Sequence, residues 1–483
     1  MQYRSIIRIL GLLVAVFSVS MLPPALVSLW YQDGAGVPFL LSFVICVTAG
    51  LLIWYPNRSY QRDLKVRDGF LIVVMFWLVL GAVGTLPLYL SPETGMNLAD
   101  ATFEAFSGLT TTGATVLTGI ETLPKAILFY RQQLQWLGGM GIIVLAVAIL
   151  PMLGVGGMQL YKAETPGPVK DNKVTPRIAD TAKHLWLIYV VLTLACALAY
   201  RLAGMGWFDA VGHSFSTVAI GGFSTYDASI GHFDSSAINI ICVVFLLLSA
   251  INYPLHFAAM RGKNILTYWR DPELRAFLFI QGSLVLLIFI GLLRSQVYDT
   301  TWQAFDHGLF QAVSISTTAG FATGGFAYWP LYLPILLIFS SFIGGCAGST
   351  GGGMKVVRVL LLFLQGKREL NRLVHPRAIY SIKLGRRAVP DRVVEAVWGF
   401  FAAYALVFVI IMLLLIMTGL DNMTAFTATA ACLNNLGPGL GEVASHYGEL
   451  ADISKYLLVL AMVFGRLEIF TLLVLFTPAF WKN

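Results

Sequence analysis

Long runs of apolar residues without a single charge recur along the chain and alternate with short charged segments. A helix that crosses a membrane needs about 20 predominantly apolar residues, and most of these runs reach that length. The uncharged stretch at residues 307–354 is too long for one helix, so we place a span that begins in its second half. The pattern predicts ten membrane-spanning segments, at residues 9–32, 34–57, 69–92, 132–161, 184–200, 235–260, 276–293, 331–363, 397–420 and 456–476.

Four shorter, moderately apolar segments lie between these spans, at residues 100–115, 209–225, 302–323 and 421–441. They are too short to cross a membrane and indicate segments that enter and leave on the same side. Each contains a glycine, and Gly113, Gly222, Gly320 and Gly437 recur at intervals of 109, 98 and 117 residues. Repeats of this period predict that one structural unit occurs four times.

We therefore predict an all-α polytopic membrane protein in which a span, a re-entrant pore loop and a second span occur four times in a pseudo-fourfold arrangement. Two extra transmembrane helices precede the repeats. The expected boundaries are residues 1–67 for the two N-terminal helices, and residues 68–180, 181–270, 271–390 and 391–483 for pore repeats one to four.

The composition excludes several classes of protein. Of the 483 residues, 57% are hydrophobic and 12% are charged, whereas soluble domains carry about 25% charged residues. A soluble enzyme and a nucleic-acid-binding protein are therefore ruled out, and the lipid bilayer is the expected environment. The five cysteines are scattered through apolar segments without the spacing of a zinc site or a disulfide framework.

The basic residues indicate the orientation. With the N-terminus in the cytoplasm, 26 of the 32 lysines and arginines fall on the cytoplasmic side, as the positive-inside rule requires. The opposite, outer side receives the four glycine-containing loops and, among basic residues, Lys125, Arg131, Arg201, Arg294 and Lys455. Residues 355–392 hold ten lysines and arginines. The positive-inside rule accounts for them, and docking of a cytoplasmic regulator is a compatible interpretation.

The centres of the four loops offer hydroxyl, amide and backbone carbonyl oxygens but no carboxylate, histidine or thiol. Their sequences are TTTGAT at residues 110–115, AIGGFS at 219–224, TTAGFA at 317–322 and NNLGPG at 434–439. Such oxygens are ligands for an alkali cation, and glycine can adopt the positive φ that turns successive carbonyls the same way. One loop alone favours an ordinary glycine-rich turn, but four at a similar period favour a potassium filter.

A family resemblance rests on the same residues: SGLTTTGAT at 107–115, AIGGFST at 219–225, TTAGF at 317–321 and LNNLGPGLG at 433–441. They closely resemble the four filter loops of the Trk/Ktr/HKT superfamily of potassium transporters. The resemblance spans the whole chain and is to the membrane subunit of bacterial Trk systems, including the two extra N-terminal helices. It implies potassium uptake across the bacterial inner membrane by a protein that is usually a homodimer and is gated by a cytoplasmic nucleotide-binding regulator, TrkA.

The resemblance also assigns the positions that line the ion path. They are the two residues before each glycine, Thr111, Thr112, Ile220, Gly221, Thr318, Ala319, Asn435 and Leu436, beside the filter glycines Gly113, Gly222, Gly320 and Gly437. The fourth loop departs from the others with its Asn-Leu-Gly-Pro sequence, so we expect a filter that is only roughly fourfold. Because each loop has one clear filter glycine where a TVGYG filter has two, we expect modest selectivity for K⁺ over Na⁺.

A glycine-rich run at residues 344–353 interrupts the predicted span at 331–363. It is not a phosphate-binding loop, because it lacks GK[ST] and lies within the membrane; a flexible kink is one interpretation. In the superfamily this place holds an intramembrane loop that obstructs the pore, which implies a gate formed by Gly345, Gly348, Gly351 and Gly352 with Arg466. Arg466 lies near the middle of the last span, where a charge costs about 2.5–3.5 kcal/mol, and an internal salt bridge or carbonyl clamp is the alternative.

Two rival classes of function differ from this prediction. A carrier-type secondary transporter usually has inverted repeats and a polar site at the midplane, whereas these repeats run in the same sense. A membrane enzyme would need a nucleophile, a carboxylate pair or a metal cluster facing a cavity. We therefore predict a transporter rather than an enzyme, with K⁺ as the transported ion and no bound organic cofactor. The sequence leaves open whether the flux is passive or is proton-coupled symport.

Overall fold

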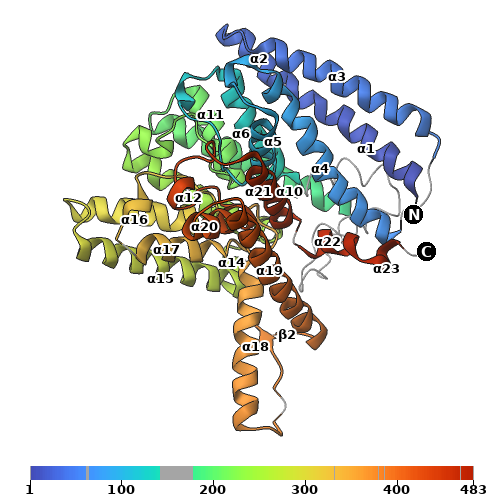
Figure 1. Ribbon diagram of the computed structural model, residues 1–483. Coiled ribbons are helices and arrows are strands. Elements are labelled where there is room, and N and C mark those ends of the chain that lie inside the picture. Colours follow the sequence, from blue (N-terminus) through green and yellow to red (C-terminus); the bar gives the residue numbers. More distant parts are fainter. Residues whose placement is uncertain are drawn as a thin grey trace.

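The computed structural model describes residues 2–60, 65–141, 178–330, 332–378, 380–385, 387–467 and 469–481. These residues are mostly helical (Figure 1), in agreement with the predicted fold class. Among them the only sheet is an antiparallel hairpin of β1 (Lys383–Leu384) and β2 (Arg387–Ala388), in which Lys383 lies opposite Ala388.

Two helical segments at the N-terminus precede the rest of the fold. Helices α1 (Tyr3–Ser18) and α2 (Leu22–Tyr31) continue as one apolar span, and α3 (Gly36–Trp54) returns beside α1. A Cβ on Gly50 would lie 2.6 Å from the backbone nitrogen of Ala15. A small residue at this position therefore allows α1 and α3 to pack closely, as is common between membrane helices.

The remaining chain follows the predicted order of long helix, short helix and third helix. The long helices are α4 (Val66–Leu90), α10 (Ile178–Leu202), α15 (Pro272–Ser295) and α19 (Asp391–Met417). Each precedes one of four helices that we refer to as the short helices: α5 (Leu98–Leu109), α11 (Trp207–Ala219), α16 (Thr301–Ser316) and α20 (Asn422–Leu433). The third helices are α6 (Lys125–Gly139), α12 (Ser236–Ala250), α17 (Tyr332–Ser341) and α21 (Asp452–Arg466).

The other elements connect these helices or follow them. They are α13 (Tyr253–Gly262), α14 (Leu266–Arg270), α18 (Val356–Val374), α22 (Phe470–Leu473), α23 (Pro478–Trp481) and the 3-10 helices η1 (Val19–Met21), η2 (Tyr55–Asn57), η3 (Pro92–Thr94), η4 (Ile120–Thr122), η7 (Ser229–Phe233), η8 (Phe326–Tyr328), η9 (Gly441–Val443) and η10 (Val474–Phe476). Helix α18 projects from the body of the molecule, toward the bottom of Figure 1.

The structure corrects several predicted spans. By length and apolarity, six helices in the described residues could cross a membrane, or eight if each of two bent pairs is one span. Residues 235–260 bend by 90° between α12 and α13, where Pro254 lacks the N–H that would continue the helical ladder. The last span bends by 105° after α21. The span predicted at 331–363 is interrupted between α17 and α18, where the glycine-rich run at 344–353 predicted a break. The span predicted at 132–161 begins in α6, and its later part lies outside the described residues.

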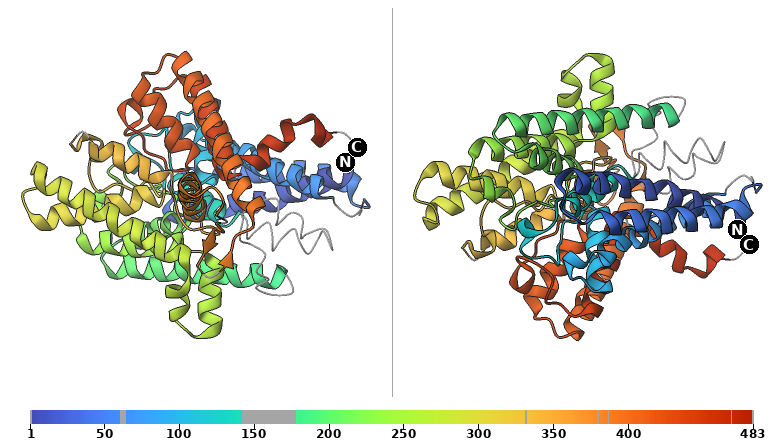
Figure 2. Two further views of the ribbon diagram at one scale, coloured as in Figure 1. Left: turned by 90° about the horizontal axis from the view of Figure 1, so that it is seen from below. Right: turned by 90° about the horizontal axis from the view of Figure 1, so that it is seen from above.

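The groups of helices surround the middle of the molecule. Seen from below in Figure 2, the blue helices α1–α4, the green α10–α13, the yellow α15–α17 and the orange-red α19–α21 point outward, and α18 is viewed end-on in the centre. The long helices expose large apolar side chains, such as Phe279 and Leu406, whereas Ala312 and Ala428 in the short helices are fully buried. An apolar outer surface is suited to lipid, so the short helices lie in the interior of the protein.

Candidate functional site

The four short helices end in the same hydrogen-bonded turn. The N–H directly before each loop glycine donates to the carbonyl five residues earlier: Thr112 to Ser107, Gly221 to Ser216, Ala319 to Ser314 and Leu436 to Ala431, each at 2.8 Å. One position earlier, Thr111, Ile220, Thr318 and Asn435 have φ values of 56°, 56°, 72° and 55°. This is the Schellman arrangement, in which glycine usually takes the left-handed position. Other residues are strained there by about 1–3 kcal/mol each, so surrounding contacts must hold these turns.

We call the four turns the glycine loops. Through their glycines they form a closed ring of contacts. Their φ values are 80°, 81°, 80° and 97° for Gly113, Gly222, Gly320 and Gly437. A Cβ added to Gly113 would lie 2.0 Å from the Gly221 oxygen, and one added to Gly222 would lie 2.0 Å from the Ala319 oxygen. A Cβ added to Gly320 would lie 2.1 Å from the Leu436 oxygen, and one added to Gly437 would lie 2.7 Å from the Thr112 oxygen. Each loop thus touches the next, and the fourth returns to the first. A side chain at any of the four positions would collide with a carbonyl.

All eight predicted lining residues lie in this ring and are buried. The backbone pattern repeats four times, but the side chains do not. In the fourth loop, the Asn435 amide donates to the Thr112 hydroxyl and to the Met462 carbonyl, both at 3.0 Å. The residue that departs from the other loops therefore links the fourth loop to the first.

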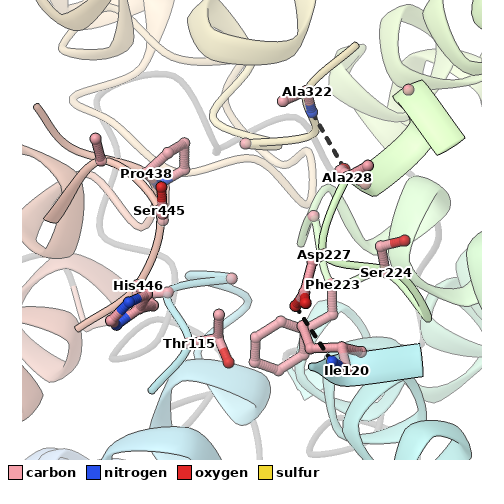
Figure 3. Close-up of a pocket in the computed structure, with 18 of the residues that line it drawn as sticks. Thr115, Ile120, Phe223, Ser224, Asp227, Ala228, Ala322, Pro438, Ser445 and His446 are labelled. Atoms are coloured by element: carbon pink, nitrogen blue, oxygen red, sulfur yellow. Dashed lines mark hydrogen bonds between the residues drawn. The ribbon is translucent and has the colours of Figure 1, made fainter. Parts of the chain in front are cut away.

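A cavity of about 590 Å³ lies on one side of the ring and is lined by residues that follow all four glycines. Figure 3 labels Thr115, Phe223, Ala322 and Pro438, one from each loop, around this cavity. At its edge the Asp227 carboxylate accepts hydrogen bonds from the Gly119 and Ile120 N–H groups at 2.8 and 3.2 Å. The Asp227 N–H in turn donates to Glu121, which lowers the pKa of the Glu121 carboxyl. Glu121 is therefore negatively charged at neutral pH.

The loop at residues 344–353 lies against the opposite side of the ring. The Thr350 hydroxyl donates to the Val218 carbonyl at 3.0 Å, just before the second glycine loop. The Gly352 N–H donates to the Thr318 hydroxyl at 2.7 Å, and the Gly353 N–H donates to the Asn434 carbonyl at 3.0 Å. The 344–353 loop is therefore bonded to the region of the second, third and fourth glycine loops.

The four glycines that the resemblance assigned to a gate all lie in this loop. A Cβ on Gly352 would lie 1.9 Å from the Asn434 oxygen, and one on Gly351 would lie 2.9 Å from the Thr317 oxygen. The carbonyls of Gly348 and Gly345 accept hydrogen bonds from Tyr253 and Val356 at 3.2 and 3.1 Å. Gly351 and Gly352 thus allow the loop to approach the ring closely, whereas Gly345 and Gly348 connect it to α18 and α13.

Arg466, at the end of α21, completes the contacts around the 344–353 loop. Its guanidinium donates to the Thr350 carbonyl at 3.3 Å, to the Thr111 hydroxyl at 3.5 Å and to the Gly138 carbonyl. It also lies 5.1 Å from the centre of the Trp77 ring, within the range of a cation–π contact. The side chain therefore bridges the first glycine loop and the 344–353 loop through hydroxyl and carbonyl oxygens.

Several further residues of this site were not predicted from the sequence. One Glu273 oxygen accepts the N–H groups of Ala347 and Val357 at 2.7 and 3.2 Å, and so joins the 344–353 loop to the start of α18. A carboxylate at the beginning of a long apolar helix was the available signal. Gly138 and Gly465 lie where a Cβ would come within 1.8 and 2.2 Å of carbonyls at the ends of α5 and α20. They follow Gly113 and Gly437 at similar intervals, which a comparison of the repeats could have detected.

The oxygen atoms of backbone and hydroxyl groups dominate the chemistry of this site. Within the described residues, no group of three or more His, Cys, Asp or Glu side chains is arranged to hold a metal ion. The ring instead presents backbone carbonyls from adjacent glycine loops, and the four short helices end at the ring. Such an arrangement can replace the water around a weakly hydrated cation.

Comparisons with known proteins identify the family. The TrkH family model, described as cation transport protein, matches residues 36–483. The Trk system potassium uptake protein TrkH of Vibrio parahaemolyticus is 66% identical and that of Escherichia coli K12 is 60% identical, over 100% of each chain, and the E. coli TrkG is 45% identical over 99%. The crystal structure of the potassium transporter TrkH from V. parahaemolyticus matches with a TM-score of 0.92 at 64% identity over 100% of both chains.

These relatives are named as transport proteins rather than enzymes, which confirms the prediction of a transporter. The match to the crystal structure confirms the helical, multi-span fold class. Because the family model covers most of the sequence and the relatives align over their full lengths, this chain belongs to the TrkH family of cation transport proteins.

Proposed function

We propose that this protein takes up potassium ions across the bacterial inner membrane and that the ring of glycine loops is its selectivity filter. The observation that carries the proposal is the closed ring, in which each loop glycine lies against a carbonyl oxygen of the next loop. The relatives named as potassium uptake proteins support K⁺ as the transported ion.

In the proposed filter, carbonyl oxygens replace the water that a potassium ion loses on entry. The four short helices end at the ring, and the partial negative charge at a helix C-terminus lowers the free energy of a cation there. The left-handed residues Thr111, Ile220, Thr318 and Asn435 are the ones that turn the chain before each glycine. Since each loop has one such closely packed glycine, we expect fewer tight sites than in a TVGYG filter and modest discrimination against Na⁺.

The cavity of about 590 Å³ serves as the periplasmic entrance in this proposal. The carboxylates of Asp227, which lines the cavity, and of Glu121, which is hydrogen-bonded to Asp227, attract cations, since a cleft with charge of one sign concentrates ions of the other. The N-terminus and the basic residues 355–392 then lie in the cytoplasm, which is the orientation that the positive-inside rule predicts.

The 344–353 loop and Arg466 form the closed gate. The loop lies directly against the ring, so an ion that leaves the filter meets glycine backbone and the guanidinium. The positive charge repels the cation, and the hydrogen bonds to Thr350 and Thr111 hold the loop in place. Opening requires the loop to move aside, and α18 begins only a few residues after it.

A cytoplasmic nucleotide-binding regulator of the TrkA type would move this gate by binding one conformation more tightly than the other. Helix α18 follows the loop and lies within the basic segment, projects from the body of the molecule and exposes Leu370, Leu373 and Val374. These features fit a surface that contacts other proteins, and we include both the regulator and a second copy of this chain as partners.

The decisive test of the filter is the exchange of Gly113 for serine. We expect Gly113→Ser to reduce the ratio of Rb⁺ to Na⁺ flux in proteoliposomes by about tenfold, because the side chain displaces the Gly221 carbonyl and alters ion coordination. Wild-type protein should also restore growth at low potassium to bacteria without their own uptake systems, and the variant should do so poorly.

Gly119→Ser is the matched control. Gly119 also has a positive φ, of 63°, but its nearest neighbour would be a hydroxyl 3.6 Å from the new Cβ. Both variants therefore carry similar backbone strain, and only Gly113→Ser meets a carbonyl of the ring. An unchanged Rb⁺ to Na⁺ ratio in well-inserted Gly113→Ser protein would remove this loop from the filter.

A further inference from the structure

A buried ion pair lies beside the cavity, behind the first and second glycine loops. Arg131 of α6 donates from Nε to an oxygen of Glu104 of α5 at 2.7 Å, and the exposed fractions of the two side chains are 1% and 0%. Charged groups in a site of this kind are stable only when they are paired and hydrogen-bonded. The two charges are therefore buried here as a pair, and the pair is part of the structure of the fold.

Glu104 holds the chain that follows the first filter glycine. Its two oxygens accept the Thr115 hydroxyl at 3.0 Å, and one of them also accepts the Val116 N–H at 3.0 Å. With Arg131 as a third donor, the carboxylate is surrounded by hydrogen-bond donors. The position of Thr115, which lines the cavity, consequently depends on Glu104.

Arg131 extends this support to the second loop. Its Nη1 donates to the Ser224 carbonyl at 3.1 Å and its Nη2 to the Thr115 hydroxyl at 3.2 Å. The guanidinium carbon lies 4.2 Å from the centre of the Phe223 ring, and both Arg131 and Phe223 line the cavity. One side chain thus joins the residues that follow Gly113 to those that follow Gly222.

The other short helices carry a different residue at the same place. Glu104 lies nine positions before its loop glycine, and the corresponding residues are His213, Gln311 and Ala428. His213 Nε2 shares a hydrogen bond of 2.9 Å with the Ser224 hydroxyl, and the Gln311 amide donates to the Phe321 carbonyl at 3.4 Å. The position supports the cavity side of three loops, but only the first uses a charge, and only there does an arginine balance it.

We propose that the Glu104–Arg131 pair is a charge-balanced clasp that positions the first two loops and keeps the entrance of the cation path electrostatically neutral at this point. The inference rests on the proposed filter function. Glu104 and Arg131 are positioning residues in it: the pair holds Thr115 and Ser224, and each charge cancels the other. Without Glu104, a guanidinium would face entering cations; without Arg131, a carboxylate would retain them.

The two single variants, each of which removes one charge, should therefore shift the half-saturating Rb⁺ concentration in opposite directions. In proteoliposomes we expect Glu104→Gln to raise the half-saturating Rb⁺ concentration about tenfold with little change in maximal rate, because uncompensated positive charge at a cleft opposes cation entry. Glutamine keeps an acceptor for Thr115 and Val116, so the change is mainly one of charge. Arg131→Gln should lower both the half-saturating concentration and the maximal rate, since the ion then leaves the carboxylate slowly.

The double variant Glu104→Gln with Arg131→Gln removes both charges and should return the half-saturating concentration to near the wild-type value. A residue that served the fold alone would lower the rate or the yield in both single variants in the same direction. If Glu104→Gln protein does not accumulate, the double variant decides: wild-type-like half-saturation supports the clasp, and a double variant that also fails to accumulate or stays shifted overturns it.

The outcomes separate this inference from the filter itself. Wild-type protein that carries no Rb⁺ in the same vesicles would overturn the proposed function. Wild-type transport together with single variants that are unchanged, or that shift half-saturation in the same direction, would overturn the clasp and leave the filter intact.

Discussion

The two sides of the ring of glycine loops are held in different ways. On the cavity side, buried side chains support the backbone: Glu104 bonds to Thr115, and the Tyr447 hydroxyl donates to the Gly437 carbonyl at 2.7 Å. On the opposite side, the 344–353 loop has six glycines among its ten residues. Most hydrogen bonds of this loop involve its backbone N–H and carbonyl groups. Examples are the Gly353 N–H, which donates to the Asn434 carbonyl, and the Cys346 N–H, which donates to the Ala250 carbonyl.

This difference indicates which side of the ring can move. Side chains from several helices form a buried polar network on the cavity side, and such networks specify one arrangement. A glycine-rich loop has many accessible backbone conformations, and its main-chain bonds can be exchanged without unpacking side chains. In the proposed function, discrimination between ions requires the first property and gating requires the second.

Replacing Arg466 should give the largest effect on the movable side. The Arg466→Ala protein loses hydrogen bonds from a charged group to Thr350 and Thr111, each worth about 1.5–3 kcal/mol. We expect basal Rb⁺ flux without the regulator to rise by roughly tenfold, while the Rb⁺ to Na⁺ ratio stays close to that of wild type. Flux into proteoliposomes with and without the regulator measures both quantities.

Two further variants sharpen this prediction. Arg466→Lys keeps the positive charge but not the planar fork that reaches several oxygens, so flux between the wild-type and alanine values would show that hydrogen bonds hold the gate. Deletion of residues 348–351 should also raise basal flux. A well-folded Arg466→Ala protein with wild-type basal flux would exclude Arg466 from the gate.

Glu273 offers a smaller perturbation at the ends of the same loop. In Glu273→Ala, the N–H groups of Ala347 and Val357 lose their acceptor. Unpaired buried groups destabilise the closed position, and we expect a rise in basal flux of about threefold to tenfold. Glu273→Gln retains an acceptor oxygen and should stay within about twofold of wild type; equal flux in the alanine and glutamine variants would contradict this role.

The smallest expected effect is at Asp421, the N-cap residue of α20, at the opposite end of this helix from the ring. Its carboxylate caps α20 by accepting the N–H groups of Met423 and Thr424 at 2.8 and 3.2 Å. Asp421→Ala should reduce the free energy of unfolding by about 1 kcal/mol, with unchanged Rb⁺ to Na⁺ ratio. Thermal unfolding of the purified protein measures the loss, and Asp421→Asn, which keeps a capping oxygen, is the control.

The cap also predicts a pH dependence. Hydrogen bonds from the Thr424 side chain and backbone lower the pKa of Asp421 from its ordinary value of 3.8. Because the pKa is lowered in the folded state, the contribution of the ionised cap to stability is complete above the ordinary value of 3.8. This contribution is lost as the pH falls through the lowered pKa. The amide introduced by Asp421→Asn does not titrate, so the difference in melting temperature between this control variant and wild type should change only in acid. A difference that stays constant as the pH falls through the acid range would contradict the capping role.

Much of the fold could be predicted because its signals are local. The apolar runs located the long helices α4, α10, α15 and α19, and the recurring glycines located the ring. The bend before Pro254 was missed, since an uncharged run looks the same whether its helix is straight or bent. The break between α17 and α18 was predicted, because the glycine-rich run at 344–353 lies there. The sequence also did not reveal that Arg131 and Lys455 are buried, or that Lys455 is paired with Asp100 at 2.6 Å.

By itself the sequence determined that this is a helical membrane protein with four similar loops, because the length of an apolar run and the interval between glycines are properties of neighbouring residues. Only the tertiary structure decided which carbonyl lies against which glycine, and which charges pair. The contact between Gly437 and Thr112 and the hydrogen bond from Arg466 to Thr111 join residues more than 300 positions apart. Such contact partners are selected by the packing of whole helices, and no local sequence pattern predicts them.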